Sequence, residues 1–404
     1  MPEPAPPIVT YRFGWIVPID RPPIRGGVIQ VCGGRIIGVS ASADIPIDHD
    51  LSHLTAAPAL VNAHTHLEFS LLENPLGTPG MPFTAWIGEV IRYRQSQGDD
   101  LAEMKQRAIT QGLKESAESG VGLVGEISTL PLPENIYAGH SCEVVSLLEL
   151  IGMSAPRIAE LQQIAAAHLQ GSTGEAQGLS PHAPYSVHRQ VVQHAAELSA
   201  HQQLPVAMHL AETREEIELL TRQSGPFREM LQGLGVWNES AFTPETTILD
   251  YLRALTPAHR ALAIHGNYLS GEEIQFLAEQ RDRMTLVYCP RTHHYFGHDP
   301  YPLPELLLAG VRVALGTDSR ASNPSLNLWE EVQHLAQHFP AIPPEAVLRM
   351  VTSDAAHGLA QEENFGTLAP GKRAVLSVWD VAVDNERDLW PEMLTGQPRL
   401  LSLT

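Results

Sequence analysis

Apolar residues follow two kinds of pattern along the chain. Up to about residue 57 they form short runs broken by glycine and proline, IVTYRFGWIV and GGVIQVCGGRIIGVS, before a polar stretch that ends at Ala57-Pro58. Such runs are typical of a small unit of β-strands joined by turns. From Ala59 onward, short apolar runs alternate with longer helical stretches, which indicates βα repeats around a parallel sheet.

Eight apolar runs in this second part have the length of buried strands. They are ALVNAH (59–64), GLVGEI (122–127), EVVSLLEL (143–150), GLSPH (178–182), PVAMHL (205–210), LAIHG (262–266), TLVYCP (285–290) and VRVALGTD (311–318). Eight strands alternating with helices predict an α/β fold, a (β/α)8 TIM-like barrel. The stretch from 211 to 260 is harder to assign, and we expect helices and a loop over the barrel mouth there.

The C-terminal part is predicted to return to the first unit. Helices are expected over 327–339 and 344–359, after which GTLAPGKRAVLSVWDV turns and continues as a strand. The predicted domains are therefore a composite β domain made of residues 1–57 plus 364–404 and a catalytic barrel over 58–363.

Composition places the chain among ordinary globular enzymes. It has 404 residues, of which 43% are hydrophobic and 18% charged, and no run approaches the ~18 uninterrupted apolar residues of a membrane span. The N-terminal MPEPAPPIVTYRFGW lacks the basic region and apolar core of a leader peptide. We therefore expect a cytoplasmic protein that does not associate with membranes.

Charge and cysteine content limit the kinds of partner, disulfide and thiolate metal site that the chain is expected to have. A net charge of −20 without a lysine or arginine cluster opposes binding to nucleic-acid polymers and leaves a small-molecule substrate as the expected partner. The three cysteines, Cys32, Cys142 and Cys289, show no C-x-x-C pairing, so neither a disulfide framework nor a thiolate zinc site is indicated. The oligomeric state stays open, a homodimer included.

Candidate metal ligands stand at the ends of the predicted strands. In AHTHLEFS, His64 and His66 are two residues apart, so strand alternation puts both on one face. His209 ends PVAMHL, His265 ends ALAIH and Asp318 ends VALGTD. Because catalytic residues of such barrels gather at the C-terminal ends of the strands, these five side chains should converge on one point.

Burial of these groups also indicates a metal ion. An imidazole or carboxylate at the end of an apolar strand is costly without a partner, and a shared cation supplies one. Imidazole nitrogen and carboxylate oxygen suit Zn²⁺ or Fe²⁺, whereas copper and calcium fit poorly.

The same segments carry a family resemblance that covers nearly the whole chain. PALVNAHTHLE, SPHAPYSV, MHLAET, IHGNYL, CPRTHHYF, LGTDSRASN and GTLAPGKRAVLSVWD resemble, in this order and spacing, the amidohydrolase superfamily. Within it they are similar to the branch of adenosine and guanine deaminases and chlorohydrolases. The resemblance implies a (β/α)8 barrel flanked by a β-sandwich built from both termini.

The resemblance also implies the metal site. The ligands would be His64, His66, His209 and Asp318, holding one divalent ion, Zn²⁺ first and Fe²⁺ as the alternative. Binuclear members have a carboxylated lysine on a middle strand, but the lysines here are Lys105, Lys114 and Lys372, and none lies on such a strand. A mononuclear site follows.

Three catalytic roles follow from the resemblance. A divalent ion can lower the pKa of bound water from ~15.7 to about 7 and so provide hydroxide. Glu212 would protonate the ring nitrogen beside the attacked carbon, and Asp318 would take the water proton and pass it to departing ammonia. His265 would orient the hydroxide without binding the metal. The alternative for Glu212 is a solvated carboxylate in the first turn of a helix.

Substrate contacts are implied by shorter matches. SPHAPYSV resembles the nucleoside-side segment of thioadenosine and S-adenosylhomocysteine deaminases, which makes His182 a substrate contact. Their ribose-binding glutamate is absent, because Thr84 and Ala85 precede Trp86. Glu68 could replace it.

The combination H-x-H-L-E-F-S is similar to the aminodeoxyfutalosine deaminases of menaquinone biosynthesis. The implied substrate, 6-aminodeoxyfutalosine, is an aminated purine nucleoside with a carboxylate that would seek an arginine. Arg291, Arg320 and Arg214 are the candidates.

Other functions stay open at this point. Within the class, the chain could be another deaminase or a dechlorinase of guanine-like, adenosine-like or triazine rings, or a hydrolase of carbon–nitrogen bonds in cyclic amides. Outside it, a catalytically dead barrel could serve as a scaffold. The presence of all four ligands together with Glu212 and His265 argues against that last reading.

Overall fold

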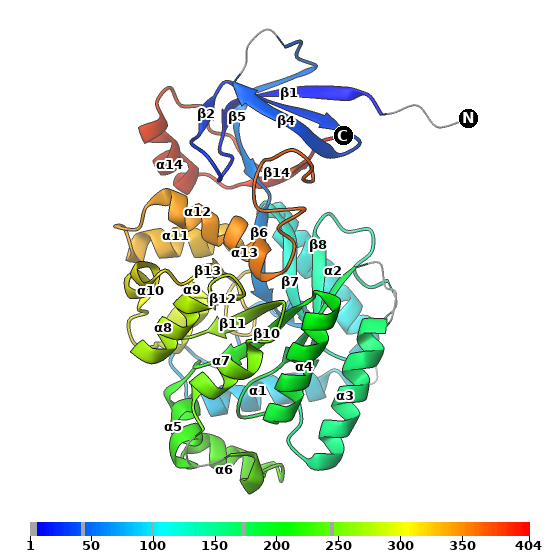
Figure 1. The fold of residues 1–404 in the computed structure, drawn as a ribbon, viewed down its shortest axis with the longest axis vertical. Coiled ribbons are helices and arrows are strands. Elements are labelled where there is room, and N and C mark those ends of the chain that lie inside the picture. Colours follow the sequence, from blue (N-terminus) through cyan, green and yellow to red (C-terminus); the bar gives the residue numbers. More distant parts are fainter. Residues whose placement is uncertain (1–5, 42–44, 99–100, 134, 171–174, 243–245) are drawn as a thin grey trace, which may run out of the picture.

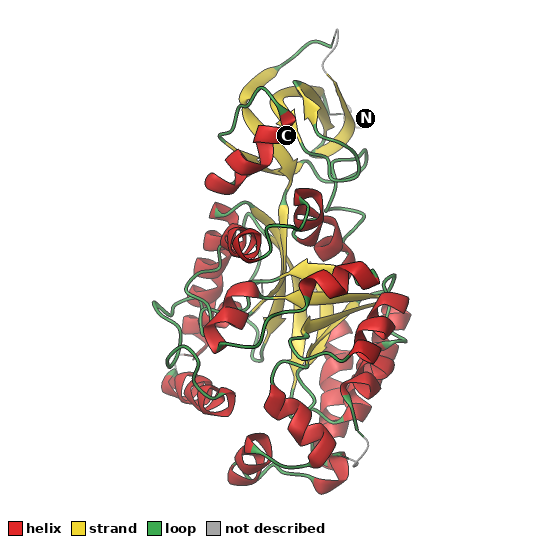
Figure 2. Cartoon of the chain, turned by 90° about the vertical axis from the view of Figure 1, so that its left-hand side faces the viewer, coloured by secondary structure: helices red, strands yellow, loops and turns green. Residues whose placement is uncertain are grey.

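A computed structural model describes residues 6–41, 45–98, 101–133, 135–170, 175–242 and 246–404. In this part of the chain two sheets account for the strands, one built from both ends of the chain and one parallel barrel sheet (Figure 1). The sheet from the chain ends lies at one end of the molecule, and the barrel with its surrounding helices makes up the rest (Figure 2).

The first sheet joins the two ends of the chain, as predicted. Its described strands run in the order β15-β14-β5-β1-β3-β4, with β2 paired to β1. Their bounds are β1 Ile8–Ile16, β2 Ile24–Arg25, β3 Gly27–Cys32, β4 Arg35–Ala41, β5 His49–Pro58, β14 Val375–Trp379 and β15 Arg399–Ser402. Because β14 pairs antiparallel with β5, the C-terminal strands complete a sheet begun by the N-terminal ones. The predicted domain boundaries stay a prediction, and residues 1–5 of the first one lie outside the described residues.

The prediction missed strand β5, which occupies the stretch described above as polar. Its first half, HDLSH, is largely exposed, whereas its second half, LTAAP, is buried. The ten-residue strand was not predicted because its polar first half is exposed to solvent and only its second half is buried in the core.

All eight predicted barrel strands are present. Their order, β13-β12-β11-β10-β9-β8-β7-β6, follows the sequence, and neighbouring strands pair in parallel. Their bounds are β6 Leu60–Thr65, β7 Val121–Ser128, β8 Glu143–Leu150, β9 Ala176–Pro181, β10 Pro205–Leu210, β11 Arg260–His265, β12 Met284–Tyr288 and β13 Val313–Leu315.

The barrel closes where β6 meets the end of β13. Thr65 and Asp318 form an isolated parallel bridge, and the Asp318 backbone N–H donates to the His64 carbonyl over 3.1 Å. Gly316 lies so close to His64 that an added Cβ would stand 2.9 Å from the His64 Cβ. The seam of the barrel therefore runs through residues predicted to bind metal.

Helices surround the barrel and cover its ends. The α-helices are α1 Phe83–Ser96, α2 Leu101–Glu118, α3 Ala155–Gln170, α4 Arg189–Gln202, α5 Arg214–Arg222, α6 Pro226–Gly233, α7 Ile248–Leu255, α8 Gly271–Glu279, α9 Pro290–Phe296, α10 Leu303–Ala309, α11 Leu328–His338, α12 Pro344–Met350, α13 Ser353–Gly358 and α14 Glu386–Thr395. Helix α11 confirms the prediction for 327–339. The single helix predicted over 344–359 is instead two, α12 and α13, and α14 was not predicted.

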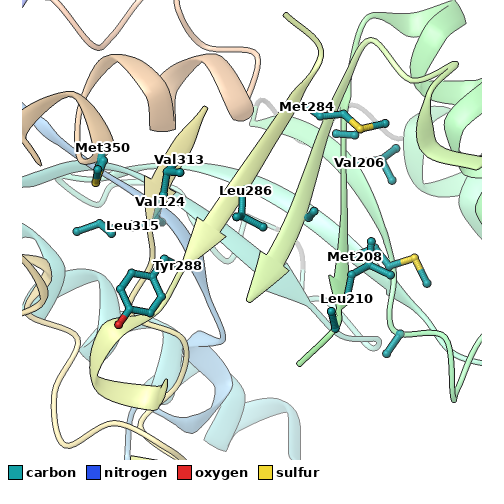
Figure 3. Close-up of a cluster of buried hydrophobic side chains, with 14 of the residues drawn as sticks. Val124, Val206, Met208, Leu210, Met284, Leu286, Tyr288, Val313, Leu315 and Met350 are labelled. Atoms are coloured by element: carbon teal, nitrogen blue, oxygen red, sulfur yellow. The ribbon is translucent and has the colours of Figure 1, made fainter. Parts of the chain in front are cut away.

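Alternation along the strands builds two apolar layers. Val206, Met208 and Leu210 of β10 belong to the apolar cluster between the barrel and its helices, to which α12 contributes Met350 (Figure 3). Ala207 belongs to the inner cluster, which α13 closes through Ala355, Ala356 and Leu359. One end of the barrel interior is thus filled with apolar side chains, which leaves the other end for chemistry.

Part of the stretch 211–260 lies at that other end, and helices occur within it as predicted. These are α5, α6, the short 3-10 helix Glu239–Ala241 and α7, with 243–245 outside the described residues. Residues between Met230 and Ser240 line a cavity above the strand ends. In the described part of the chain, no helix has the length and apolarity to cross a membrane.

Candidate metal centre and its cavity

The four predicted metal ligands meet at the C-terminal ends of their strands. His64 and His66 come from β6, His209 from β10 and Asp318 from the segment after β13, and all are at most 8% exposed. Asp318 Oδ1 lies 3.6 Å from His64 Nε2 and 3.7 Å from His66 Nε2. The ring centroids of His209 and His64 are 5.0 Å apart. The convergence expected from the strand ends is therefore present in the fold.

Buried nitrogen atoms at this point lack hydrogen-bond partners. Both ring nitrogens of His64 and Nδ1 of His66 are buried and unpaired. His209 Nδ1 lies 3.0 Å from the His182 carbonyl, to which it can only donate, so its Nε2 keeps a lone pair. Unpaired buried imidazoles beside a carboxylate are costly, and a divalent ion such as Zn²⁺ or Fe²⁺ would satisfy them. The residues fit a metal.

The pKa shifts at the centre favour the protonation states that bind a metal, namely neutral histidine rings and an ionised aspartate. Burial holds the pKa of His66 and His209 well below the ordinary value, so both rings are neutral near pH 7. Burial alone would raise the pKa of Asp318, but the adjacent His64 and the other nearby histidines outweigh it and keep this pKa low. Ser322 Oγ also donates to Asp318 Oδ2 over 3.1 Å.

His265 reaches the same point by a backbone turn. Along β11, Leu262 and Ile264 face the barrel interior, so alternation would send His265 outward. Its φ of +73° breaks the alternation, and its ring lies 5.5 Å from that of His209. Such backbone conformations in non-glycine residues persist where the surroundings enforce them, often at functional sites.

The distances around His265 are compatible with metal binding and with positioning of water, and its predicted role stays a prediction. Ligand nitrogens of His64, His209 and His265 lie within 4.8 Å of one another, as do ligand atoms of His64, His66 and Asp318. His265 Nε2 is also 3.3 Å from Glu212 Oε1, so the ring connects the histidine cluster with that carboxyl group.

Glu212 is buried beside the cluster and is held from two sides. Burial, with the charges of Asp318 and Glu216, raises its pKa well above the ordinary value, which favours the protonated form. The Glu216 side chain accepts hydrogen bonds from the backbone N–H of Ala211 and Glu212 over 3.0 and 2.9 Å. Asn267 Nδ2 donates to the Glu212 carbonyl over 2.9 Å. A solvated helix carboxylate is therefore excluded as the description of Glu212.

The environments of the two carboxyl groups shift their pKa values in opposite directions. This favours Glu212 as an acid and Asp318 as a carboxylate. Such a pair can donate a proton at one atom and accept one at another.

A cavity of about 970 Å³ opens from this centre. His66, His209, Glu212, His265 and Asp318 line its floor. His182 lines the wall, and burial lowers its pKa to about 3, while its predicted contact with substrate stays a prediction. Aromatic and aliphatic residues form most of the remaining wall: Phe69, Phe83, Trp86, Ile87, Val90, Ile91, Ile151, Met153, Tyr185, Met230, Leu231, Leu234, Val236 and Trp237.

Glu68 lies one layer behind the cavity wall. Its carboxylate is 2.5 Å from Arg94 Nη2 and accepts from Thr129 Oγ1 over 3.2 Å. Arg94, from α1, is among the residues that line the cavity, whereas Glu68 is not among the described lining residues. Glu68 is thus placed to hold Arg94, and its predicted direct contact with substrate stays a prediction.

The arginines predicted to bind a substrate carboxylate point elsewhere. Arg291 pairs with Glu330 over 2.5 Å, and Arg320 forms two hydrogen bonds to Glu115 of 2.8 and 3.0 Å. Among the described residues that line the cavity, neither Arg291 nor Arg320 occurs.

Arg214 pairs with Asp299 at a separate groove. The sequence could not show that acidic partners engage these three side chains outside the cavity.

Three charged residues of the described cavity lining were not singled out from the sequence. Arg94 and Arg157 line the cavity, but neither carries a sequence signal because both stand on helices among other polar residues. Glu149 had one, since it stands near the end of the predicted strand EVVSLLEL. Its side chain is 5% exposed, and its oxygens lie 3.8 Å from Arg94 and 3.8 Å from His182.

Comparisons with known proteins agree with the fold and identify the family. The Amidohydrolase family profile matches residues 55–398. The chain is 30% identical over 310 residues to the aminodeoxyfutalosine deaminase of Deinococcus radiodurans, covering 72% of this chain and 70% of that protein. It is 27% identical over 384 residues to the 5-methylthioadenosine/S-adenosylhomocysteine deaminase of Moorella thermoacetica, covering 91% and 84%.

A solved structure shares the architecture. The aminofutalosine deaminase of Helicobacter pylori in complex with methylthio-coformycin superposes with a TM-score of 0.84 at 22% identity, covering 96% of this chain and 97% of that one. At this identity the likeness shows that the fold is shared.

Proposed function

The chain belongs to the amidohydrolase family, and from this we propose that it is a hydrolase that removes the amino group from the ring of an adenosine-like nucleoside. The observation that carries the proposal is the buried Glu212 carboxyl group 3.3 Å from His265, on the floor of a cavity that also presents three histidines and Asp318. Two sequence relatives named as deaminases of adenine nucleosides support this substrate class.

His64, His66, His209 and Asp318 would hold one divalent ion. Such an ion supplies hydroxide at neutral pH by lowering the pKa of a water molecule. The nitrogen and oxygen donors favour Zn²⁺, with Fe²⁺ as the alternative. The four ligands, like the roles given below, are proposals.

The protein's own groups move the protons. Glu212, protonated in its buried position, donates a proton to the ring nitrogen next to the attacked carbon. Asp318, held as a carboxylate, accepts the proton of the attacking water and returns it to the amino group. Water adds to the ring carbon, the carbon–nitrogen bond breaks and ammonia leaves, while the proton that remains on the new hydroxyl group returns to Glu212, so that the ring keeps a carbonyl group and the acid is restored. His265 positions the attacking water.

For the substrate itself we propose 6-aminodeoxyfutalosine, which would place the enzyme in menaquinone biosynthesis. The HTHLEFS segment and the relative from Deinococcus radiodurans support it. The cavity has room for a nucleoside with a further aromatic group, and its walls above the centre are mainly apolar.

Ammonia release by protein whose metal content has been measured tests both the proposed reaction and the proposed substrate. The panel is aminodeoxyfutalosine, adenosine, methylthioadenosine, S-adenosylhomocysteine, guanine and a chlorinated triazine. Glu212→Gln should lower kcat by about two to four orders of magnitude, because it removes the proton donor but keeps the size of the side chain. Glu215→Gln, in the first turn of α5 just after Glu212, is the matched control and should retain activity.

The outcomes separate the alternatives. Preference for aminodeoxyfutalosine supports the full proposal, whereas preference for another purine nucleoside retains the reaction and rejects the substrate. Chloride release from the triazine would indicate a dechlorinase. Stoichiometric metal with no ammonia from any purine would direct the search to cyclic amides, and a protein that purifies without metal would be a scaffold.

A further inference from the structure

A second group of histidines lies outside the cavity. His294 belongs to α9, while His334 and His338 stand four residues apart on α11 and therefore on one face of that helix. The rings of His334 and His338 are stacked with centroids 4.1 Å apart, and the His294 ring is 5.3 Å from that of His334. One ligand nitrogen from each residue lies within 4.8 Å of the other two.

One of these rings is already oriented as metal ligands usually are. His338 Nδ1 lies 2.8 Å from the His334 carbonyl oxygen, and because that oxygen can only accept, Nδ1 carries the hydrogen. The other nitrogen, Nε2, is then left with its lone pair. Metal-ligating histidines almost always donate their second N–H to a carbonyl or carboxylate in this way.

The group is separate from the proposed catalytic centre. Among the described residues that line the cavity, His294, His334 and His338 do not occur. His294 and His338 are exposed and His334 is half-buried, so an ion could reach them from solvent without entering the cavity.

We propose that His294, His334 and His338 form a second, surface site for a divalent transition metal such as Zn²⁺, with water completing the coordination. Three imidazoles suit zinc, nickel or copper and disfavour magnesium or calcium. Zinc–nitrogen bonds of about 2.0–2.1 Å place tetrahedral ligand atoms roughly 3.4 Å apart. The three ligand atoms must therefore approach one another by at most about 1.4 Å, and the exposure of His294 and His338 leaves their rings room to rotate.

An ion here would clamp two helices that are joined on another side. The Arg291 backbone N–H donates to Glu331 over 2.9 Å, which connects α9 to α11. Glu331 in turn accepts from Asn323 Nδ2 over 2.7 Å, and the same Nδ2 donates to the Thr317 carbonyl over 2.7 Å. Thr317 precedes Asp318. The second ion would thus stiffen the helices that support the segment carrying a proposed catalytic ligand, without taking part in the reaction.

Zinc binding by the intact protein tests the site. Protein carrying one equivalent of zinc is dialysed against free Zn²⁺ at pH 7.5, and the bound metal is measured by mass spectrometry. Wild type should take up about one further equivalent, for a total of two. His338→Ala and the double variant H334A/H338A should stay at one, with affinity for the further ion weakened about a hundredfold or more. His201→Ala, which changes an exposed histidine on α4, should bind two.

Copper provides a second readout that does not depend on stoichiometry. Cu²⁺ added to the zinc-loaded protein should give an electron paramagnetic resonance spectrum with nitrogen hyperfine splitting in wild type, and this splitting should be lost in H334A/H338A. His338→Ala should unfold at the wild-type temperature when no second metal is added, which excludes a folding defect. Wild type that stops at one equivalent, or variants that bind two, would overturn the proposal whatever reaction the enzyme catalyses.

Discussion

At the scale of single residues, Glu149 is a buried acid in a cavity wall that has both positively and negatively charged side chains nearby. Burial raises its pKa to about 7, although the nearby Arg94 acts in the opposite direction and Glu68 adds to the rise. A carboxyl group with a folded-state pKa above its unfolded value contributes stability that is fully present below the unfolded pKa of ~4.5 and is lost as pH rises through 7.

Glu149→Gln should therefore change how stability depends on pH. Wild type should become less stable relative to the variant between pH 5 and pH 8, by up to about 3 kcal/mol from 2.5 pKa units. Unfolding in urea at both pH values measures the difference, and groups common to both proteins cancel. A constant difference across this range would show that the carboxyl group ionises normally. Glu160→Gln, at an exposed pair with Arg157, is the control.

The carboxylate of the proposed substrate needs a cation, and Arg157 is the better placed of the two cavity arginines. Arg94 is already paired with Glu68, whereas the Arg157 side chain is 41% exposed and pairs with Glu160 beside the cavity. Arg157→Ala should raise KM for aminodeoxyfutalosine about tenfold or more, because a charge-assisted hydrogen bond is lost.

Steady-state kinetics with two substrates checks this. KM for methylthioadenosine, which lacks the carboxylate, should change less than twofold. Arg214→Ala, at the separate groove, should leave both values unchanged. An equal rise for both substrates would mean that Arg157 shapes the cavity and does not bind the carboxylate.

At this scale, the sequence predicted the positions of residues that carry metal-binding side chains and also stand at the ends of predicted strands. The five strand-end groups could be placed because a barrel collects its strand ends. Arginine partners could not be placed, since ion pairs such as Arg320 with Glu115 join residues 205 positions apart. The conformation of His265 was also out of reach, because its positive φ depends on the surrounding structure.

At the scale of elements, the start of α5 shows how a helix positions an acid. Thr213 caps the helix by accepting from the Glu216 N–H over 3.2 Å, and the Glu216 side chain reaches back to the N–H groups of Ala211 and Glu212. Ala211 has a φ of +51°, so these two bonds hold a turn that is strained for alanine.

Glu216→Gln should therefore act through Glu212. We expect kcat to fall about tenfold while KM stays within twofold, because the amide keeps the shape but loses one of two acceptors. A fall in thermal stability without a change in kcat would mean that Glu216 only stabilises the fold and does not position Glu212. Glu216→Asp, which restores the charge on a shorter side chain, should recover part of the rate.

Element boundaries were less predictable than element types. One pattern predicted a single helix over 344–359, whereas the chain forms α12 and α13 with Thr352 between them at φ −138° and ψ −94°. The break lets Ala355 and Leu359 enter the barrel interior. Periodicity alone does not show such a turn, since both helices keep an apolar face.

At the scale of the whole molecule, the proposed metal would join strands that the backbone joins only weakly. Its ligands come from β6, β10 and the end of β13, and β6 meets β13 at an isolated bridge. Removing the ion by chelation should lower the unfolding temperature by about 5 °C, from roughly 4 kcal/mol of binding and an unfolding entropy near 0.8 kcal/mol/K for this chain length.

Calorimetry of the His338→Ala variant, with and without chelator, isolates this centre from the second site. His209→Ala should already melt at the lower temperature and respond little to chelation. If chelation does not change the melting of His338→Ala, the seam is stable without metal and the ion serves chemistry alone.

Closure of the barrel through Thr65 and Asp318 joins residues 253 positions apart. At translation speeds of ~5–20 residues per second, Asp318 leaves the ribosome roughly 10 to 50 seconds after His64 and His66. During that interval the two histidines lack the carboxylate that would complete the proposed ion site. Metal binding at this centre would therefore come late in the synthesis of each chain, and a product truncated before its last barrel strand would lack a complete site.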